Sequence, residues 1–283
     1  IKNHDSIGAI LIQHTFGFIP KNYLSIKKLS IEYKIPIIED RCHCNFLNDF
    51  SDISLKGNTD QIAYCYSFEN GKPIKLGRGG LIIFNTNNIL LSRSADKLYE
   101  SANKASILYS LLHFVISVIY SLLIDTKCYW FLLNQYRKLA NKKILPSNHN
   151  TLFDNLKINK MVFPQSLIIS ILIFSIKKRS SLKLKISKFL HKIINYLFVP
   201  FFKNSKRYPI FVKNKEKALR FCEKGNITVA SFFNTVIQPL NEEDFNIVEY
   251  EKNTCKNAEL ASMHIISFEK KPNQSIINKL KML

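Results

Sequence analysis

The stretch IGAILIQHTFGFIPKNYLSIKKLSIEYKIPIIED, residues 7–40, decides the fold. It opens with a short apolar run at 7–13 and closes with a second at 35–39, and both runs are typical of buried strands. Between them, residues 21–34 follow Pro20 and place apolar side chains among lysines at helical spacing, which predicts an amphipathic helix. Strand, helix and strand in this order predict a βαβ unit, and hence a parallel sheet.

Two further strands are expected in the same sheet, at 61–67 and 81–85. Ligand sites in such sheets lie beyond the carboxyl ends of the strands. Asp40 and Ser67 both stand at strand ends of this kind. A glycine-rich turn, formed by Gly77, Gly79 and Gly80, is expected just before the last strand.

Composition sets broad limits on the chain. It has 283 residues with 46% hydrophobic side chains, which excludes a wholly disordered protein. Six cysteines in this length do not make a disulfide scaffold and predict a reduced, cytoplasmic compartment. The sequence begins at Ile1 without a signal peptide, and we expect its natural start to lie upstream.

The excess of positive charge is concentrated in the middle of the chain. The formal net charge is +20, and residues 101–210 carry 18 basic and 2 acidic side chains, or +16. The segments on either side, 1–100 and 211–283, carry +2 each. Nucleic-acid binding is disfavoured because only 7 of the basic residues are arginine and no known binding motif is present.

The middle segment also holds two uncharged runs, at 106–124 and 161–176, followed by a lysine-rich stretch at 177–192. The first run is barely long enough to span a membrane, which takes about 20 apolar residues. Its four serines, two tyrosines and one histidine favour a buried or interfacial helix. The lysine-rich stretch is open to two interpretations, a solvated helix face or a membrane-surface contact through 106–204.

The last part of the chain alternates again between apolar runs and helical patterns. A strand is expected at 208–212 and a helix at 215–224, ended by Gly225. A short helix is expected at 257–263, and a terminal helix at 276–283.

One block of residues carries the chemistry. It reads SFENGKPIKLGRGG over 67–80, with Glu39-Asp40-Arg41-Cys42-His43 upstream. Lys72 would lie on a loop after a strand, with an acid at another strand end. A lysine that forms a Schiff base must lose its proton near neutral pH, and a carboxylate facing a pyridinium nitrogen keeps that nitrogen protonated.

This block resembles the motifs of the DegT/DnrJ/StrS sugar aminotransferases, which are pyridoxal 5'-phosphate (PLP) enzymes. The string S-F-x3-K-x4-G-x-G-G, after E-D-x-x-H, is similar to theirs, as is His14-Thr-Phe-Gly17. The family's C-terminal motifs are matched by Arg207-Tyr-Pro-Ile-Phe-Val, by Cys255–Ala261 and by 266–269. The resemblance is good over 7–90 and 205–283 and poor between them.

The resemblance implies a role for each matched residue. Lys72 would be the Schiff-base lysine and would later move the proton. Asp40 would pair with the pyridinium nitrogen, His43 would lie against the ring or its 3'-hydroxyl, and Ser67 would bind the phosphate. Asn159, in a faint match to a further motif, would reach the partner subunit's phosphate.

Purely structural roles remain open for several of these residues. Asp40 could be a turn or capping residue, Ser67 could cap a turn, and His14 is interpreted as structural. A metal site is disfavoured for Cys42-His43-Cys44, since no second Cys/His pair stands at ligand spacing. The family usually has Glu or Asp where Arg78 stands, and a sugar dehydratase would have His in place of Lys72.

Together these features predict an α/β chain of three parts. Residues 1–105 would be the C-terminal part of an aspartate-aminotransferase-like (PLP fold type I) large domain that lacks its N-terminal part. Residues 106–204 would be a basic, apolar helical segment, and 205–283 a small α+β domain. The implied reaction is transamination of a nucleotide-linked keto sugar in polysaccharide biosynthesis, with a donor such as glutamate, by a cytoplasmic homodimer. The alternative is a catalytically degenerate binding or structural protein, associated with a membrane surface.

Overall fold

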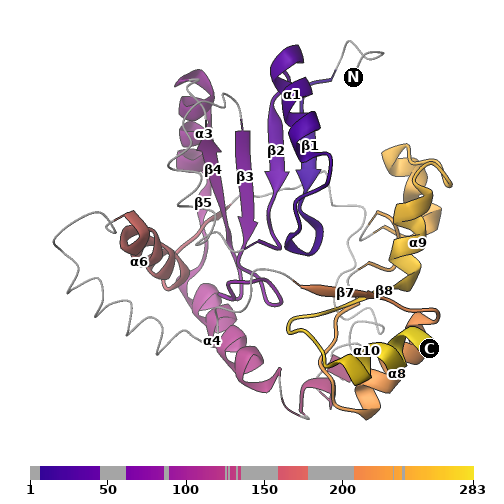
Figure 1. Cartoon of the computed structure of the whole chain (residues 1–283). Coiled ribbons are helices and arrows are strands. Elements are labelled where there is room, and N and C mark those ends of the chain that lie inside the picture. Colours follow the sequence, from indigo (N-terminus) through magenta and orange to yellow (C-terminus); the bar gives the residue numbers. More distant parts are fainter. Residues whose placement is uncertain are drawn as a thin grey trace. The chain divides into compact units, whose positions relative to one another are not determined.

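The structure is a computed structural model (Figure 1), and it describes residues 7–44, 62–85, 89–124, 126, 128–131, 133–134, 159–177, 207–231, 233–237 and 240–283. The described residues fall into two compact units, one within 1–121 and 157–206 and the other within 122–156 and 207–283. These units group the residues differently from the three-part division drawn from the sequence, which stays a prediction. The sequence also predicts a polar loop at 137–160 and a helical pattern at 182–197. Both lie outside the described residues except for the last two residues of the loop, which form the short strand β6 instead.

The first unit is built on a four-stranded sheet with the order β1-β2-β3-β4. The first three strands run parallel and β4 is antiparallel to β3. Helix α1 is the crossover between β1 and β2, as the βαβ pattern predicts. The elements of this unit are β1 (Ile10–Gln13), a 3-10 turn (Thr15–Gly17), α1 (Tyr23–Tyr33), β2 (Ile37–Asp40), β3 (Ile62–Ser67), β4 (Gly80–Asn85), α3 (Ile89–Ser101), β5 (Asn103–Lys104), α4 (Ile107–Leu123), β6 (Asn159–Lys160) and α6 (Gln165–Lys177).

The two faces of the sheet differ because successive side chains of a strand point to opposite sides. Ile12, Glu39 and Tyr64 stand in register on the face that carries the core. In the next row, Gln13, Asp40 and Cys65 stand in register on the opposite face. The core is completed by residues of the loop after β3 and of α6: Phe68, Ile74, Leu76, Ile168, Ile169 and Leu172.

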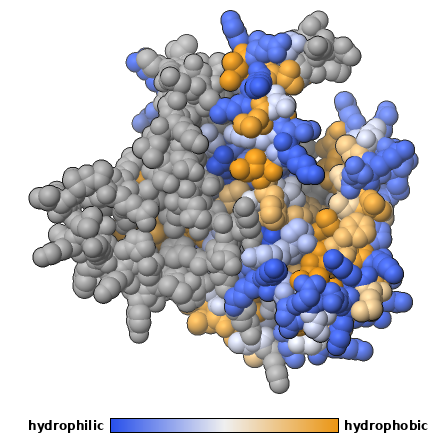
Figure 2. All heavy atoms as spheres, viewed as in Figure 1, coloured by the Kyte–Doolittle hydropathy of each residue, from blue (hydrophilic) through white to orange (hydrophobic). Residues whose placement is uncertain are grey.

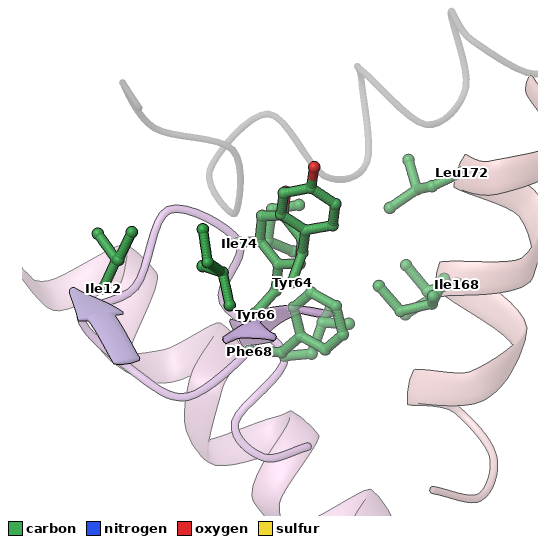
Figure 3. Close-up of a cluster of buried hydrophobic side chains, with 10 residues drawn as sticks. Ile12, Tyr64, Tyr66, Phe68, Ile74, Ile168 and Leu172 are labelled. Atoms are coloured by element: carbon green, nitrogen blue, oxygen red, sulfur yellow. The ribbon is translucent and has the colours of Figure 1, made fainter. Parts of the chain in front are cut away.

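Helix α6 packs its large aliphatic side chains into this core. Figure 3 shows Ile168 and Leu172 directed toward the aromatic rings of Phe68 and Tyr64. Burial of each such side chain contributes about 1.5–3 kcal/mol. The uncharged run at 161–176 is therefore an ordinary core helix.

The second unit confirms the pattern expected for the C-terminal part. Strands β7 and β8 pair antiparallel, and Asn214 caps α8 by accepting a hydrogen bond from the Lys217 N–H at 2.9 Å. Gly225 follows α8 as its C-cap. The elements of this unit are β7 (Tyr208–Phe211), α8 (Lys215–Lys224), a 3-10 helix (Glu242–Val248), α9 (Lys256–His264), β8 (Ile265–Phe268) and α10 (Gln274–Met282).

Candidate active site

The carboxyl ends of the parallel strands bring the first two candidate residues to one edge of the sheet. Asp40 is the last residue of β2 and Ser67 the last of β3. Asp40 stands in register with Cys65, and Ser67 lies two residues further along the same strand face. Asp40, Cys65 and Ser67 therefore share one face, opposite to the core.

Lys72 follows on the loop after β3. Burial raises the pKa of the Cys42 thiol to about 12, and the hydrogen bond and the charge of Asp40 raise it as well. The Lys72 ammonium acts on this thiol in the opposite direction and lowers its pKa. Asp40 and Lys72 are therefore both within electrostatic reach of the Cys42 thiol, and the role of each stays a prediction.

The Asp40 carboxylate is held in place by the backbone. Its Oδ1 accepts a hydrogen bond from the Cys42 N–H at 3.0 Å. Its backbone carbonyl accepts from the His14 N–H at 2.9 Å. This is the turn role that the sequence left open, and it also fixes the direction in which the carboxylate points.

His43 is buried and its ring orientation is set by Phe16. The Phe16 backbone N–H donates to His43 Nδ1 at 3.1 Å, and the two rings stack with centroids 6.2 Å apart. Because Nδ1 accepts a hydrogen bond, the neutral imidazole carries its proton on Nε2. Phe16 makes this contact from a positive φ of 58°, which no sequence pattern indicated.

Glu39, next to Asp40, points the other way and holds the strands together. It is fully buried, and its Oε2 lies 2.8 Å from both His14 Nε2 and Arg41 Nε. The Tyr23 hydroxyl donates to its Oε1 at 2.8 Å. Burial would raise the pKa of Glu39, but the bond to His14, the Arg41 charge and the Tyr23 hydroxyl together hold this pKa below its ordinary value. His14 is structural, as predicted, and Glu39 is the group that sequence reasoning missed.

The Glu39 network makes the first testable prediction. Glu39→Gln should lower the free energy of unfolding by about 3 kcal/mol at neutral pH, because it leaves buried partners unpaired. The folded-state pKa of Glu39 lies below 4.5, so the unfolded chain takes up the proton first and this stability is lost as the pH falls below about 4.5. Urea unfolding at several pH values measures both effects. Glu32→Gln, at an exposed position of α1, should change neither, and an equal loss in both variants would contradict the network.

The loop that carries Lys72 is fixed at both ends. The Phe68 N–H donates to the Gly79 carbonyl at 2.9 Å, and the Leu76 N–H donates to the Phe68 carbonyl at 2.8 Å. Buried Gln165 of α6 donates to the carbonyls of Leu76 and of Ser110 in α4, at 3.2 and 2.8 Å. The loop is thereby tied to two helices, and Lys72 in its middle remains half-buried.

Two further basic residues of this loop have aromatic partners. Lys75 is only 1% exposed, and its Nζ lies 5.5 Å from the centroid of the Tyr120 ring. Arg78 is exposed, and its Cζ lies 4.8 Å from the Tyr109 ring centroid. Desolvation and the Arg78 charge lower the pKa of His113 beside them. Arg78, the departure from the family pattern, therefore packs against α4.

Asn159 lies in a different sheet from the other candidates. It is exposed in β6, which pairs in parallel with β5 in a separate two-stranded sheet. Its role stays a prediction. Within the described ranges, no three His, Cys, Asp or Glu side chains gather as metal ligands.

Asp40 and Ser67 thus lie at the carboxyl edge of the sheet, and Lys72 and the oriented His43 imidazole follow on the loops after the same strands. Residues 3–99 match the model of the DegT/DnrJ/EryC1/StrS aminotransferase family. This match confirms the resemblance drawn from the motifs over 7–90, and it contains four of the five candidate residues, all but Asn159. The resemblance over 205–283 lies outside the matched residues and stays a prediction. The family consists of aminotransferases.

Among solved structures, the chain is similar to a DegT DnrJ EryC1 StrS aminotransferase from Brucella abortus. The two are 13% identical with a TM-score of 0.47, over 97% of this chain and 62% of that one. This chain therefore spans about 62% of the length of the aminotransferase it matches. Comparison with curated proteins returned no match.

Proposed function

We propose that this chain carries the lysine-bearing part of a PLP-dependent aminotransferase. The acceptor would be a nucleotide-linked keto sugar, and the donor an amino acid such as glutamate. The observation that carries the proposal is that Asp40 and Ser67 end neighbouring parallel strands on one face, directly before the loop of Lys72, inside the segment that matches the aminotransferase family. The sugar substrate is supported by the resemblance of the motifs around Lys72 to those of sugar aminotransferases.

The residues at the sheet edge fit PLP in their chemistry. The cofactor has an aldehyde that needs an amine, a ring nitrogen that needs an anion, and a phosphate that needs hydrogen-bond donors. Lys72, Asp40 and Ser67 supply these three groups, and Asp40 is already oriented by the Cys42 N–H at 3.0 Å. His43 Nδ1 is occupied by the Phe16 N–H, which leaves the Nε2 proton to donate to an oxygen on the ring.

When bound, PLP supplies an electron sink that stabilises negative charge on the carbon bearing the amino group. The Asp40 carboxylate would hold the proton at the ring nitrogen. Lys72 Nζ would bind the cofactor covalently, and after release it would move a proton to and from the substrate carbon. Ser67 Oγ would bind the phosphate.

A homodimer is part of the proposal. The motif that Asn159 faintly matches implies that its side chain reaches the phosphate of the partner subunit. Its exposed position in β6 leaves it accessible to such a partner.

The test is borohydride trapping on the complete gene product. PLP is added, the mixture is reduced, and the modified peptide is mapped by mass spectrometry. We expect a pyridoxyl group on Lys72 and none on Lys75, three residues away in the same loop. A band that shifts when glutamate is added would support the donor assignment. Absence of any adduct, or an adduct on Lys75, would overturn the proposal.

A second candidate function is a binding protein that has kept the fold and lost the chemistry. The observation that favours it is Arg78, which replaces the family's acid and packs on Tyr109. The trapping experiment separates the two functions, since only the enzyme requires the covalent link at Lys72.

A further inference from the structure

Helix α4 (Ile107–Leu123) exposes large aliphatic side chains and buries serines, which is the reverse of an ordinary surface helix. Its buried side chains are serines at 110, 117 and 121. Phe114 packs against the core, whereas most of the large aliphatic side chains of the helix are between 40 and 78% exposed. They are Ile107, Leu108, Leu111, Leu112, Val115, Ile116, Ile119 and Leu122. We call these eight side chains the outer face of α4.

Helical geometry makes both sets continuous stripes. At about 100° per residue, the three serines fall within a narrow arc, whereas the outer face covers roughly the opposite half of the helix. Small inward residues allow close approach of the backbones, as at Gly77, where an added Cβ would meet the His113 carbonyl oxygen.

Helix α6 in the same unit shows that this arrangement is not forced by composition. It is also uncharged over most of its length, yet it buries Ile168, Ile169 and Leu172 in the core. An aliphatic helix in water gains about 25 cal/mol per Å² by turning its large side chains inward. Helix α4 forgoes that gain on its outer face, and an apolar surface that covered this face would recover it. Figure 2 shows, on the face in view, other apolar residues at the surface among hydrophilic ones.

The basic charge of this part of the chain indicates which kind of surface the outer face of α4 contacts. No acidic residue occurs between 101 and 124, and exposed Lys104 and Arg78 stand near the start of α4. The whole segment 101–210 carries +16. A second copy of this chain would set one strongly basic segment against another, whereas anionic lipid headgroups complement it. None of the described helices is long and apolar enough to cross a membrane.

We propose that the outer face of α4 lies in the interface of an anionic membrane, with the helix parallel to its surface. The aliphatic side chains enter the boundary between headgroups and acyl chains, and Lys104 and Arg78 near the start of the helix contact the headgroups. This inference does not rest on the proposed enzymatic function.

The test is co-sedimentation of the complete gene product with vesicles of phosphatidylglycerol mixed with phosphatidylcholine, at low salt. We expect binding that weakens with added salt and with pure phosphatidylcholine. The double variant Leu108→Ser/Leu112→Ser should bind at least about tenfold more weakly, because two leucines lose their apolar burial. The matched control is Leu24→Ser/Ile31→Ser, which changes two similarly exposed side chains on α1 and should bind like the unchanged protein.

A second readout does not depend on the affinity of the serine variants. Leu108→Trp should be quenched by brominated lipids, whereas Leu24→Trp should show only the background of the buried Trp130. Failure of the unchanged protein to bind anionic vesicles would overturn the proposal. So would equal binding by the two double variants, or a dimer without vesicle binding that dissociates on Leu108→Ser/Leu112→Ser, which would assign the face to a second copy.

Discussion

Lys72→Ala is expected to lower the turnover of the complete gene product by at least about 10³-fold and to abolish the borohydride-trapped adduct. The reason is that in the proposed function one side chain both binds the cofactor covalently and moves the proton. Lys72 is half-buried, so its removal should leave the fold intact. Thermal melting of the variant checks that point.

Lys72→Arg is the matched control for charge. It keeps the positive charge at this position of the loop but cannot form a Schiff base. We expect it to melt like the unchanged protein and to lose the adduct as fully as Lys72→Ala does. Turnover within tenfold of the unchanged protein in either variant would be incompatible with Lys72 as the nucleophile.

Gly77→Ala is expected to cost about 4 kcal/mol of stability, the largest effect of any single methyl group that the structure predicts. Gly77 has a φ of +84°, and an added Cβ would stand 2.1 Å from the His113 carbonyl oxygen. That oxygen belongs to the backbone of α4 and cannot rotate away. The loop would have to move off the helix, and the Lys72 side chain would move with it.

Gly71→Ala isolates the steric part of this effect. Gly71 has the same φ of +84°, but an added Cβ there would meet nothing within 4 Å. We expect it to cost only the conformational term, about 1–2 kcal/mol. The two variants are compared by the free energy of unfolding in urea, and equal losses would show that the loop and α4 do not approach each other closely.

The βαβ unit and the candidate residues on it could be predicted from the sequence because both depend on local patterns. The end of the apolar run places Asp40 at the edge of the sheet, and alternation along the strand sets the face on which it lies. The glycines at 77 and 79 take the positive φ expected of a turn. The motif around Lys72 and the match over 3–99 agree for the same reason, since both consist of residues close together in the chain.

The partners of Glu39 could not be predicted in this way. His14 and Tyr23 lie 25 and 16 residues before it, and they meet it only after β1 and α1 have packed against β2. Gln165, which ties the Lys72 loop to α4, lies 89 residues from its acceptor Leu76. Contacts at such separations leave no periodic signal, because they depend on how the elements pack and not on spacing along one of them.

Helix α4 shows most directly which features follow from the sequence and which follow from packing. Its sequence specified a helix without charge and with two continuous stripes, one of serines and one of large aliphatic side chains. The tertiary structure decided that the serine stripe faces the protein, and there the loop at Gly77 lies close to the helix backbone at the His113 carbonyl. The sequence therefore determined the elements and the chemistry of the strand ends, and packing decided which groups those ends bring together and which face of α4 is left outside.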